Sequence, residues 1–319
     1  MRPAGKGSKA DQMDVVTVTG NLLAEWTFEV VRLVPGATHR AERMEFQVGG
    51  KGINVSRVLQ HLGLQTEAHG FASGELAELC RGWLEEREIA HKFHPLEQGV
   101  RPGLVVRESG DPDASETTFL GLDFAVPGTS WEAAMKQIGE ERPSWLALCG
   151  SIPGWQSSWL ESVAALVHDK EIQVCADTYG PALEDLITLP LELVKINRSE
   201  LARLRPERAD GTSVELLAEV SEGSPVRNWI ITDGPNPVLA AFETGELYEV
   251  APAVIAETSA TGSGDTFLAA ILQQSLAGAG PEEMLSHATA CASANAASPN
   301  IGDFPLPVAG AYRPTILRL

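Results

Sequence analysis

The amino-acid sequence predicts an α/β protein, with an open, mainly parallel sheet flanked by helices and a small lid of β-strands. In the second half of the chain, short apolar runs alternate with amphipathic helical stretches, which is typical of βαβ units. In the first half, two strand-rich patches at about residues 37–48 and 99–121 do not fit this alternation, and we assign them to the lid. The 319 residues are 44% hydrophobic, which is enough to bury a large core.

The first half of the chain is expected to begin with a flexible tail over residues 1–12, followed by a single domain over residues 13–319. β-Branched runs and helical spacing of apolar residues define the elements here. In chain order we expect a strand over Val15–Thr19, a half-exposed strand within Thr38–Val48, and helices over Asn54–Leu62 and Glu75–Arg87. Two further strands, over Gly103–Arg107 and Glu116–Leu120, would be joined by a turn at Ser109–Pro112.

The second half supplies the alternating strands and helices of the sheet. We expect strands over Trp145–Leu148, Ile172–Ala176, Leu193–Ile196 and Trp229–Thr232, and helices such as Trp159–His168 and Ser213–Val220. An active site of such a fold lies at the carboxyl ends of the strands.

Composition excludes several classes of partner. The 24 Lys and Arg against 43 Asp and Glu give a net charge of −19, which disfavours nucleic acids and anionic membranes. No apolar run is long enough to span a bilayer, and the start of the chain does not resemble a signal peptide. The four cysteines lie in apolar surroundings without metal-ligand spacing, which favours buried thiols in a reducing compartment. We expect a cytoplasmic protein, with its seven histidines in core or surface roles rather than in a metal cluster.

A glycine-rich segment before an apolar helix is the strongest functional motif. Gly262-Ser263-Gly264-Asp265 precedes a helical run, so that backbone N–H groups can converge on an anion at the helix start. A carboxylate at this point could accept a proton from a hydroxyl that attacks the anion. The alternative is a plain loop in which Asp265 caps the helix.

A second glycine-rich segment surrounds a lysine. Gly49-Gly50-Lys51-Gly52 is not a Walker A loop, because glycine follows the lysine, and it lacks the third glycine of a dinucleotide fingerprint. By itself it is equally consistent with a tight turn and with a loop that a ligand approaches closely.

Together the two segments resemble the two signatures of the ribokinase-like (PfkB) carbohydrate kinases. The lysine in the first signature is most similar to the 1-phosphofructokinase and tagatose-6-phosphate kinase branch. Further matches in chain order are Thr17–Thr19 with Asn21, Gly150–Pro153, Asp177–Gly180, Lys195–Glu200, Thr232–Gly234 and Ala297–Gly302.

The resemblance implies roles on the phosphate side of the site. Asp265 would be the general base, and Gly262, Ser263 and Gly264 would form the anion hole for the transferred phosphoryl group. The residues along the ATP cleft would be Asn197, Thr232, Gly234 and Asn300. Asn197 and Glu200 would also hold Mg²⁺ through its water molecules.

The resemblance also implies a sugar side. Arg101 would anchor a substrate phosphate, because a guanidinium can pair with it bidentately, and Lys51 would add a second positive charge. The substrate-contacting positions would be Asn21, Glu25, Gly49, Gly50, Lys51, Asn54 and Arg101.

The sequence departs from the family pattern at several of these points. Glu25 stands where the family has an aspartate, and Gly103 and Val105 replace a polar and a positively charged residue of the lid. Pro237 replaces a glycine of the nucleotide loop and removes a backbone donor. Ser259 stands where Asp or Asn is usual, which leaves open whether a monovalent cation binds.

The expected function is therefore ATP- and Mg²⁺-dependent phosphorylation of a sugar phosphate, with fructose 1-phosphate and tagatose 6-phosphate as first candidates. Two alternatives remain: a kinase of an unphosphorylated sugar or nucleoside, and a non-catalytic relic that binds a sugar or nucleotide. We also expect that the edge and apolar face of the lid allow a homodimer to form.

Overall fold

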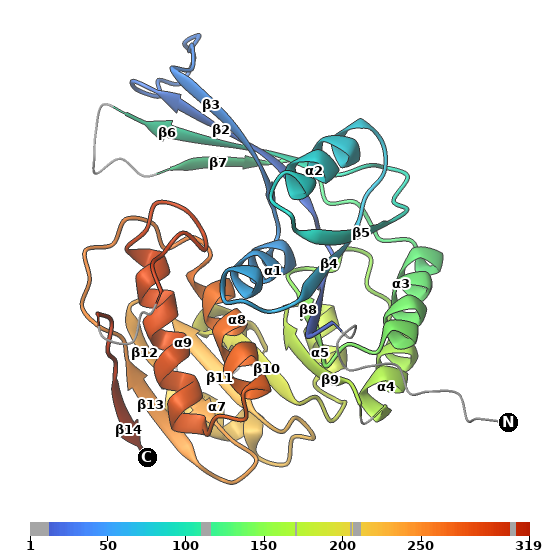
Figure 1. The fold of residues 1–319 in the computed structure, drawn as a ribbon, viewed down its shortest axis with the longest axis vertical. Coiled ribbons are helices and arrows are strands. Elements are labelled where there is room, and N and C mark those ends of the chain that lie inside the picture. The colour runs from blue at the N-terminus through green and yellow to red at the C-terminus, as the bar shows by residue number, and fades with distance from the viewer. Residues whose placement is uncertain (1–12, 110–115, 170, 205, 207–211, 307–310) are drawn as a thin grey trace, which may run out of the picture.

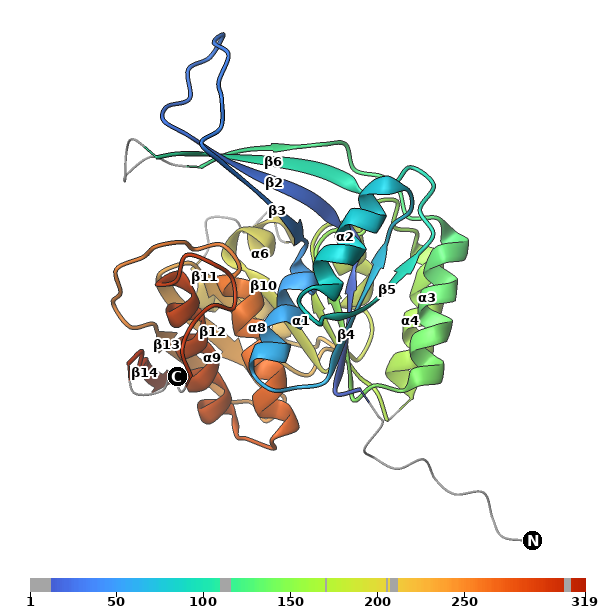
Figure 2. The same cartoon turned by 45° about the horizontal axis from the view of Figure 1, so that its top comes forward.

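The computed structural model describes residues 13–109, 116–169, 171–204, 206, 212–306 and 311–319. The expected tail and residues 110–112 of the expected turn lie outside these ranges. Within them, the chain forms one large sheet covered by helices on both faces and a four-stranded sheet that lies against one side of it (Figures 1 and 2). This is the predicted α/β fold with its lid.

The large sheet is mainly parallel. Seven neighbouring strands from β11 to β5 run in parallel. At the other edge, hairpins add two antiparallel strands, and the last strand of the chain pairs antiparallel with the second of them after two further helices. The strand order is β14 (Thr315–Arg318), β13 (Leu247–Ala251), β12 (Asn236–Ala241), β11 (Trp229–Asp233), β10 (Leu193–Asn197), β9 (Gln173–Asp177), β8 (Trp145–Cys149), β1 (Val15–Thr19), β4 (Thr66–Phe71) and β5 (Ala90–His94).

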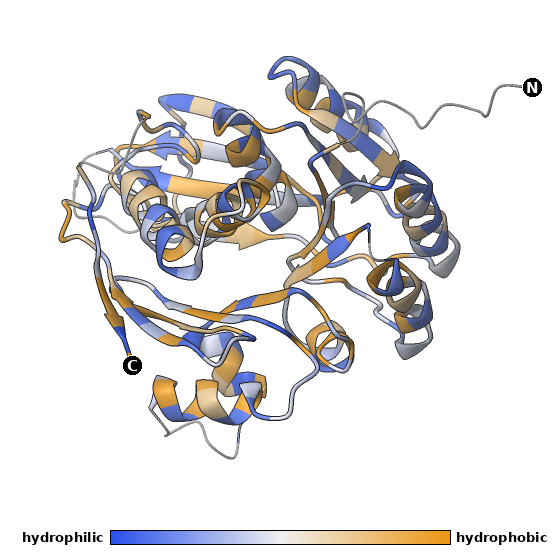
Figure 3. Cartoon of the chain, turned by 60° about the horizontal axis from the view of Figure 1, so that its bottom comes forward, coloured by the Kyte–Doolittle hydropathy of each residue, from blue (hydrophilic) through white to orange (hydrophobic). Residues whose placement is uncertain are grey.

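Helices cover both faces of the sheet, and their apolar sides form the core. Hydrophobic residues alternate with hydrophilic ones along the helices (Figure 3), as expected for helices with one face on a sheet. One face holds α1 (Lys51–His61), α2 (Glu75–Glu85), α8 (Ser263–Leu276) and α9 (Pro281–Ala296). The other holds α3 (Gly128–Glu141), α4 (Leu160–His168), α5 (Pro181–Leu186), α6 (Arg198–Leu204) and α7 (Ser213–Ser221).

The lid sheet has the order β3 (Arg43–Gly49), β2 (Leu23–Val30), β6 (Arg101–Glu108) and β7 (Thr117–Leu120). The sequence analysis assigned the outer patches to the lid but missed β2, which pairs with both β3 and β6. The signal is present, because Trp26, Phe28 and Val30 alternate with polar residues along this strand.

None of the helices in the described part of the chain combines the length and the apolar sequence needed to cross a bilayer.

Candidate active site

The start of α8 has the geometry of an anion-binding turn. Gly262 is the N-cap residue with a φ of +75°, a conformation that glycine adopts without a steric penalty. A Cβ atom on Gly262 would lie 2.6 Å from Cγ1 of Ile301, so the loop is also closely packed here. Ser263 and Gly264 open the helix, and their N–H groups have no partner within it. The N–H group of Ser263 donates to the carbonyl oxygen of Ala260 at 3.2 Å, so an anion would have to compete for it.

Asp265 is buried in the first turn of α8 and contacts the other glycine-rich segment. Its Oδ2 accepts a hydrogen bond from Nδ2 of Asn54 at 2.7 Å, which joins α8 to α1. Burial, reinforced by the nearby charge of Asp177, raises the pKa of Asp265 to about 6, although Lys195 and Asn54 act in the opposite direction. The carboxylate is therefore a stronger base than an exposed aspartate.

A buried charge network lies beside Asp265. Asp177 is completely buried, and its two oxygens accept hydrogen bonds from Nζ of Lys51 and of Lys195, each at 2.7 Å. Lys51 also donates to Oε1 of Glu200 at 3.1 Å. Burial works against both ionised partners, but the opposite charges prevail: the pKa of Asp177 is lowered, and that of Lys51 is raised above its usual range. The network holds two positive charges at the foot of the anion-binding turn.

Lys195 brings its charge directly under that turn. A Cβ atom on Gly264 would lie 3.1 Å from Nζ of Lys195, so a side chain at position 264 would press against this ammonium group. The glycine leaves room for a ligand anion to approach both the backbone N–H groups and the lysine.

A cavity of about 560 Å³ opens over this region between the sheet and α8 and α9. Its floor is polar and includes Lys195 and Asp265, whereas its outer wall is apolar and includes Val254, Ile255 and Ala292. Eight predicted site residues line it, namely Lys51, Asn197, Thr232, Gly234, Gly262, Ser263, Gly264 and Asp265. The shape suits a ligand with an apolar body and an anionic end.

Asn197 and Glu200 provide oxygen atoms beside the cavity that could bind a hydrated metal ion. Asn197 Oδ1 accepts hydrogen bonds from Oγ of Ser199 and from the backbone N–H of Glu200, and Glu200 Oε2 accepts one from the backbone N–H of Asn197. Each carboxylate oxygen of Glu200 has a second lone pair that can accept a hydrogen bond. An oxygen-only set with an ionised carboxylate fits a hydrated Mg²⁺ held through its water molecules.

Two of the predicted sugar-side residues, Asn21 and Arg101, meet at Asp123. Nδ2 of Asn21 donates to Oδ1 of Asp123 at 2.8 Å and to Oγ of Ser151 at 3.2 Å, and Nη1 of Arg101 donates to the same Asp123 oxygen at 2.9 Å. Arg101 Nε is buried and has no hydrogen-bond partner among the described residues. This cluster joins β1, β6 and the segment after β7.

The glycines of the first segment allow close approach of the backbone. Gly50 has a φ of +123° and is the N-cap residue of α1, and a Cβ atom on it would lie 2.5 Å from Cγ2 of Thr19. Gly49 ends β3 and packs against Leu23 of β2. The turn formed by Gly49 and Gly50 thus connects the lid to α1, and it leaves no space for side chains at these two positions.

The structure gives a physical reason for two departures of the lid from the family pattern. A Cβ atom on Gly103 would lie 2.8 Å from Cδ1 of Leu23, so the neighbouring strand fills this space with an apolar side chain. Val105 is buried. Glu25 hydrogen-bonds to Gln47 across the β2–β3 pair and lies opposite Gly103 on β6.

Two predicted residues lie differently from the others. Asn300 is exposed in the turn after α9, 3.5 Å from Asp303, and does not line the cavity. Pro237 is exposed in β12 and also lies outside the lining.

The sequence analysis gave no role to three charged residues of the site: Lys195 and Asp177, named there only as members of matched segments, and Asp123. The first two had a signal, since each is a charged residue within or at the end of an otherwise apolar strand. Asp123 follows the lid in an irregular segment, and only the tertiary structure places it beside Asn21 and Arg101.

The mainly parallel sheet with its lid, and the glycine-rich turn with Asp265 at the start of α8, are consistent with a kinase type of α/β protein. The chain matches the pfkB family of carbohydrate kinases over residues 13–308 and belongs to this family. It is accordingly an ATP-dependent carbohydrate kinase.

Solved structures similar to this chain include phosphofructokinases and a ribokinase. Phosphofructokinase-2 from Escherichia coli, in complex with fructose-6-phosphate, superposes with a TM-score of 0.79 at 22% identity, over 89% of this chain and 93% of that one. A possible 1-phosphofructokinase from Thermotoga maritima gives 0.79 at 19% identity, over 96% and 99%. A ribokinase from the same organism gives 0.71 at 18% identity, over 92% and 96%. At these identities the likeness shows the fold.

Proposed function

We propose that the protein transfers the γ-phosphoryl group of ATP to a hydroxyl group of a sugar phosphate, with Asp265 as the general base. The observation that carries this proposal is the hydrogen bond between Asn54 and the buried Asp265. It joins the segment expected to bind the sugar to the turn expected to hold the phosphoryl group.

In the proposed reaction, Asp265 takes the proton of the sugar hydroxyl as its oxygen attacks the γ-phosphorus. The bond between that phosphorus and the β-phosphate oxygen breaks, and ADP leaves. The N–H groups at the start of α8 and the ammonium group of Lys195 stabilise the negative charge on the transferred group. Positioning and charge stabilisation supply most of the rate enhancement in reactions of this type.

ATP would occupy the cavity with its base against the apolar wall and its phosphates toward Gly264 and Lys195. Asn197 and Glu200 would hold Mg²⁺ through water molecules, and the ion would neutralise phosphate charge. Lys51, paired with both Asp177 and Glu200, would keep these carboxylates in place rather than bind the substrate phosphate, which changes the role expected of it.

Arg101 supports a phosphorylated acceptor. Its guanidinium is partly exposed and its buried Nε has no hydrogen-bond partner among the described residues, so it can pair with a phosphate group. Fructose 1-phosphate and tagatose 6-phosphate remain the first candidates. Asp123 competes for Arg101 in this structure, and a kinase of a free sugar or nucleoside is the second candidate because Asp123 and Asn21 could bind sugar hydroxyls.

The test is ADP release with ATP and Mg²⁺ over a panel of sugar phosphates, free sugars and nucleosides, for the wild type and Asp265→Asn. We expect turnover on a sugar phosphate and a loss of about 10²–10⁴-fold in the variant, since this is the usual contribution of a general base. Asp169→Asn is the matched control, because Asp169 pairs with Arg142 at the surface and should be dispensable. Undiminished turnover of Asp265→Asn would contradict the assignment.

A non-catalytic relic would give a different result. Nucleotide would raise the melting temperature of the wild type, but no acceptor would yield ADP. Turnover confined to free sugars or nucleosides would support the second candidate.

A further inference from the structure

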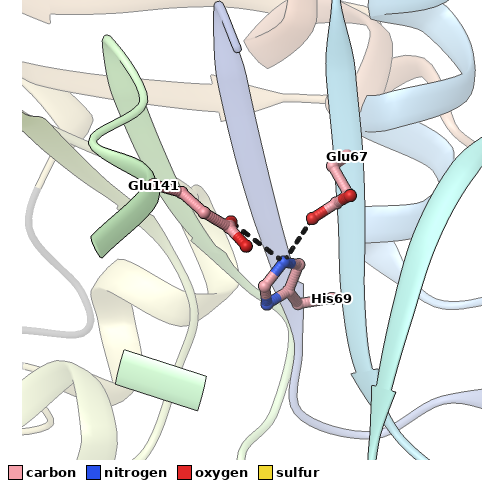
Figure 4. A group of neighbouring side chains, drawn as sticks. All are labelled: Glu67, His69 and Glu141. Atoms are coloured by element: carbon pink, nitrogen blue, oxygen red, sulfur yellow. Dashed lines mark hydrogen bonds and ion pairs between the residues drawn. The ribbon is translucent and has the colours of Figure 1, made fainter. Parts of the chain in front are cut away.

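A cluster of charged side chains on the large sheet lies apart from the cavity. Glu67 and His69 project from β4, Lys92 and His94 from β5, and Glu141 ends α3. Figure 4 shows the imidazole of His69 between the carboxylates of Glu67 and Glu141. These residues belong to the edge of the sheet, where β5 is the last strand.

We propose that this cluster is a binding site for a divalent transition-metal ion of the Zn²⁺ class, with Nε2 of His69 and the carboxylates of Glu67 and Glu141 as ligands. The three ligand atoms lie within 4.8 Å of one another. Nε2 of His69 is 2.8 Å from Oε1 of Glu67 and 3.7 Å from Oε2 of Glu141. Ligand atoms of a tetrahedral zinc ion with bonds of about 2.0–2.2 Å are separated by similar distances.

A cation already occupies this place. Nζ of Lys92 is 3.1 Å from Oε1 of Glu67 and also hydrogen-bonds to Oε1 of Glu141. Lys92 is 37% exposed, so its ammonium group can move into solvent when a metal ion takes its place beside the two carboxylates. The metal ion would replace it by exchange.

The charges of the cluster favour a doubly charged ion over the lysine. Two carboxylates face the one ammonium group of Lys92. Oε2 of Glu141 is buried and accepts no hydrogen bond from any described residue, although Gln137 donates to Oε1 of the same carboxylate. A divalent ion would balance both carboxylates and bind this oxygen.

His94 is placed to orient His69 as a ligand. Nε2 of His94 lies 3.2 Å from Nδ1 of His69. This contact between the two rings fixes the orientation of the His69 imidazole. In the metal-free protein Nε2 of His69 donates its proton to Oε1 of Glu67, and a metal ion bound at Nε2 would displace that proton.

The donor set determines the class of metal. One imidazole and two carboxylates suit Zn²⁺ and its neighbours, whereas Mg²⁺ and Ca²⁺ prefer oxygen ligands alone. The ion would tie the end of α3 to β4 and stabilise the fold. Glu67 is the second residue of β4, so the site lies away from the carboxyl end of that strand, where the active site is found.

The test uses Co²⁺ as a spectroscopic probe, added to the metal-free full-length protein. We expect one equivalent to bind, a visible absorption band typical of four or five ligands, and a rise in melting temperature. Lys92→Met removes the competing cation and should tighten binding by about tenfold or more, the effect of one nearby charge. This gain would not be expected of a cluster that serves only as an ion pair.

Two losses and one control complete the experiment. His69→Gln and Glu141→Gln should each abolish the band, and Glu141 lies at a helix end where the substitution leaves the fold intact. His287→Gln is the control, because His287 contacts Cys291 at a separate site and should not change the band. Failure of both the wild type and Lys92→Met to bind, or a band that survives His69→Gln and Glu141→Gln, would overturn the proposal.

Discussion

Single residues set the acidity of the proposed base. Burial raises the pKa of Asp265 from an ordinary value of 3.8 to about 6, so it binds a proton more tightly in the folded than in the unfolded protein. Its ionisation therefore lowers stability as the pH rises from about 4 to about 6. The pKa of Asp177 is lowered instead, and its stabilising effect is lost as the pH falls. The two neighbouring carboxylates thus have opposite effects on stability in acid.

The activity should fall on the acid side of about pH 6, because protonated Asp265 cannot accept the hydroxyl proton. Asn54→Ala removes a hydrogen bond that stabilises the ionised form, so the acid limb of the kcat profile should move to higher pH. The pH dependence of kcat for both proteins, at saturating acceptor, measures this shift. An unchanged limb would show that another group controls it.

Lys195 is expected to matter for stability as well as for catalysis. Lys195→Met leaves the fully buried Asp177 with Lys51 as its one remaining partner in the described network. Removing one partner of a buried ion pair lowers the free energy of unfolding by about 3–5 kcal/mol. Because Lys51 still pairs with Asp177, we expect a decrease of about 3 kcal/mol. Urea unfolding measures it, with the exposed Lys136→Met as control. Equal stability of the two variants would contradict this prediction.

At the scale of elements, the turn before α8 depends on glycine for two separable reasons. Gly262 has a positive φ, and the Cβ atom of an alanine there would lie 2.6 Å from Ile301. Gly278 has a similar φ of +74°, but a Cβ atom there would have no other atom within 4 Å. Both alanine variants should lose about 1 kcal/mol or more of stability from the backbone strain. Only Gly262→Ala should also lose most of its activity, because the clash displaces the anion-binding turn.

Steady-state kinetics and urea unfolding of the two variants separate these effects. Full activity in Gly262→Ala would show that the turn does not need this geometry, and a loss of activity in Gly278→Ala would show that strain alone is responsible.

At the scale of the whole molecule, the lid presents an apolar surface. Phe46, Trp26, Leu104 and Phe119 lie side by side across its four strands, and Phe119 is 54% exposed. Apolar residues in a row on an open sheet are typical of an interface between chains. The expected homodimer through the lid stays a prediction.

Phe119→Arg should shift the protein from dimer to monomer, because a charge in the row would be buried without a partner. Sedimentation velocity at several concentrations measures this. Leu317→Arg, at the exposed far edge of the large sheet, should leave the dimer intact. A wild type that sediments as a monomer throughout would rule out the lid as an interface.

The predictability of the strands depended on their burial. Strands such as β1 and β8 are buried along their whole length, so their apolar residues identified them. β4 and β5 were not predicted, because they contain histidine and charged residues whose partners come from α3 and from each other. Local sequence cannot show that such residues will be paired.

Local patterns along the chain were sufficient to predict the α/β fold, the family resemblance and the glycine-rich turn before Asp265. Which charged side chains meet followed from the packing of the elements. This packing directed Lys51 to Asp177 and Glu200, placed Lys195 below Gly264, and brought Glu67 to His69 and Glu141. The physical reason is that a buried charge must find an opposite charge or a hydrogen bond. In this fold its partner comes from another strand or helix, which only the packing of the elements specifies.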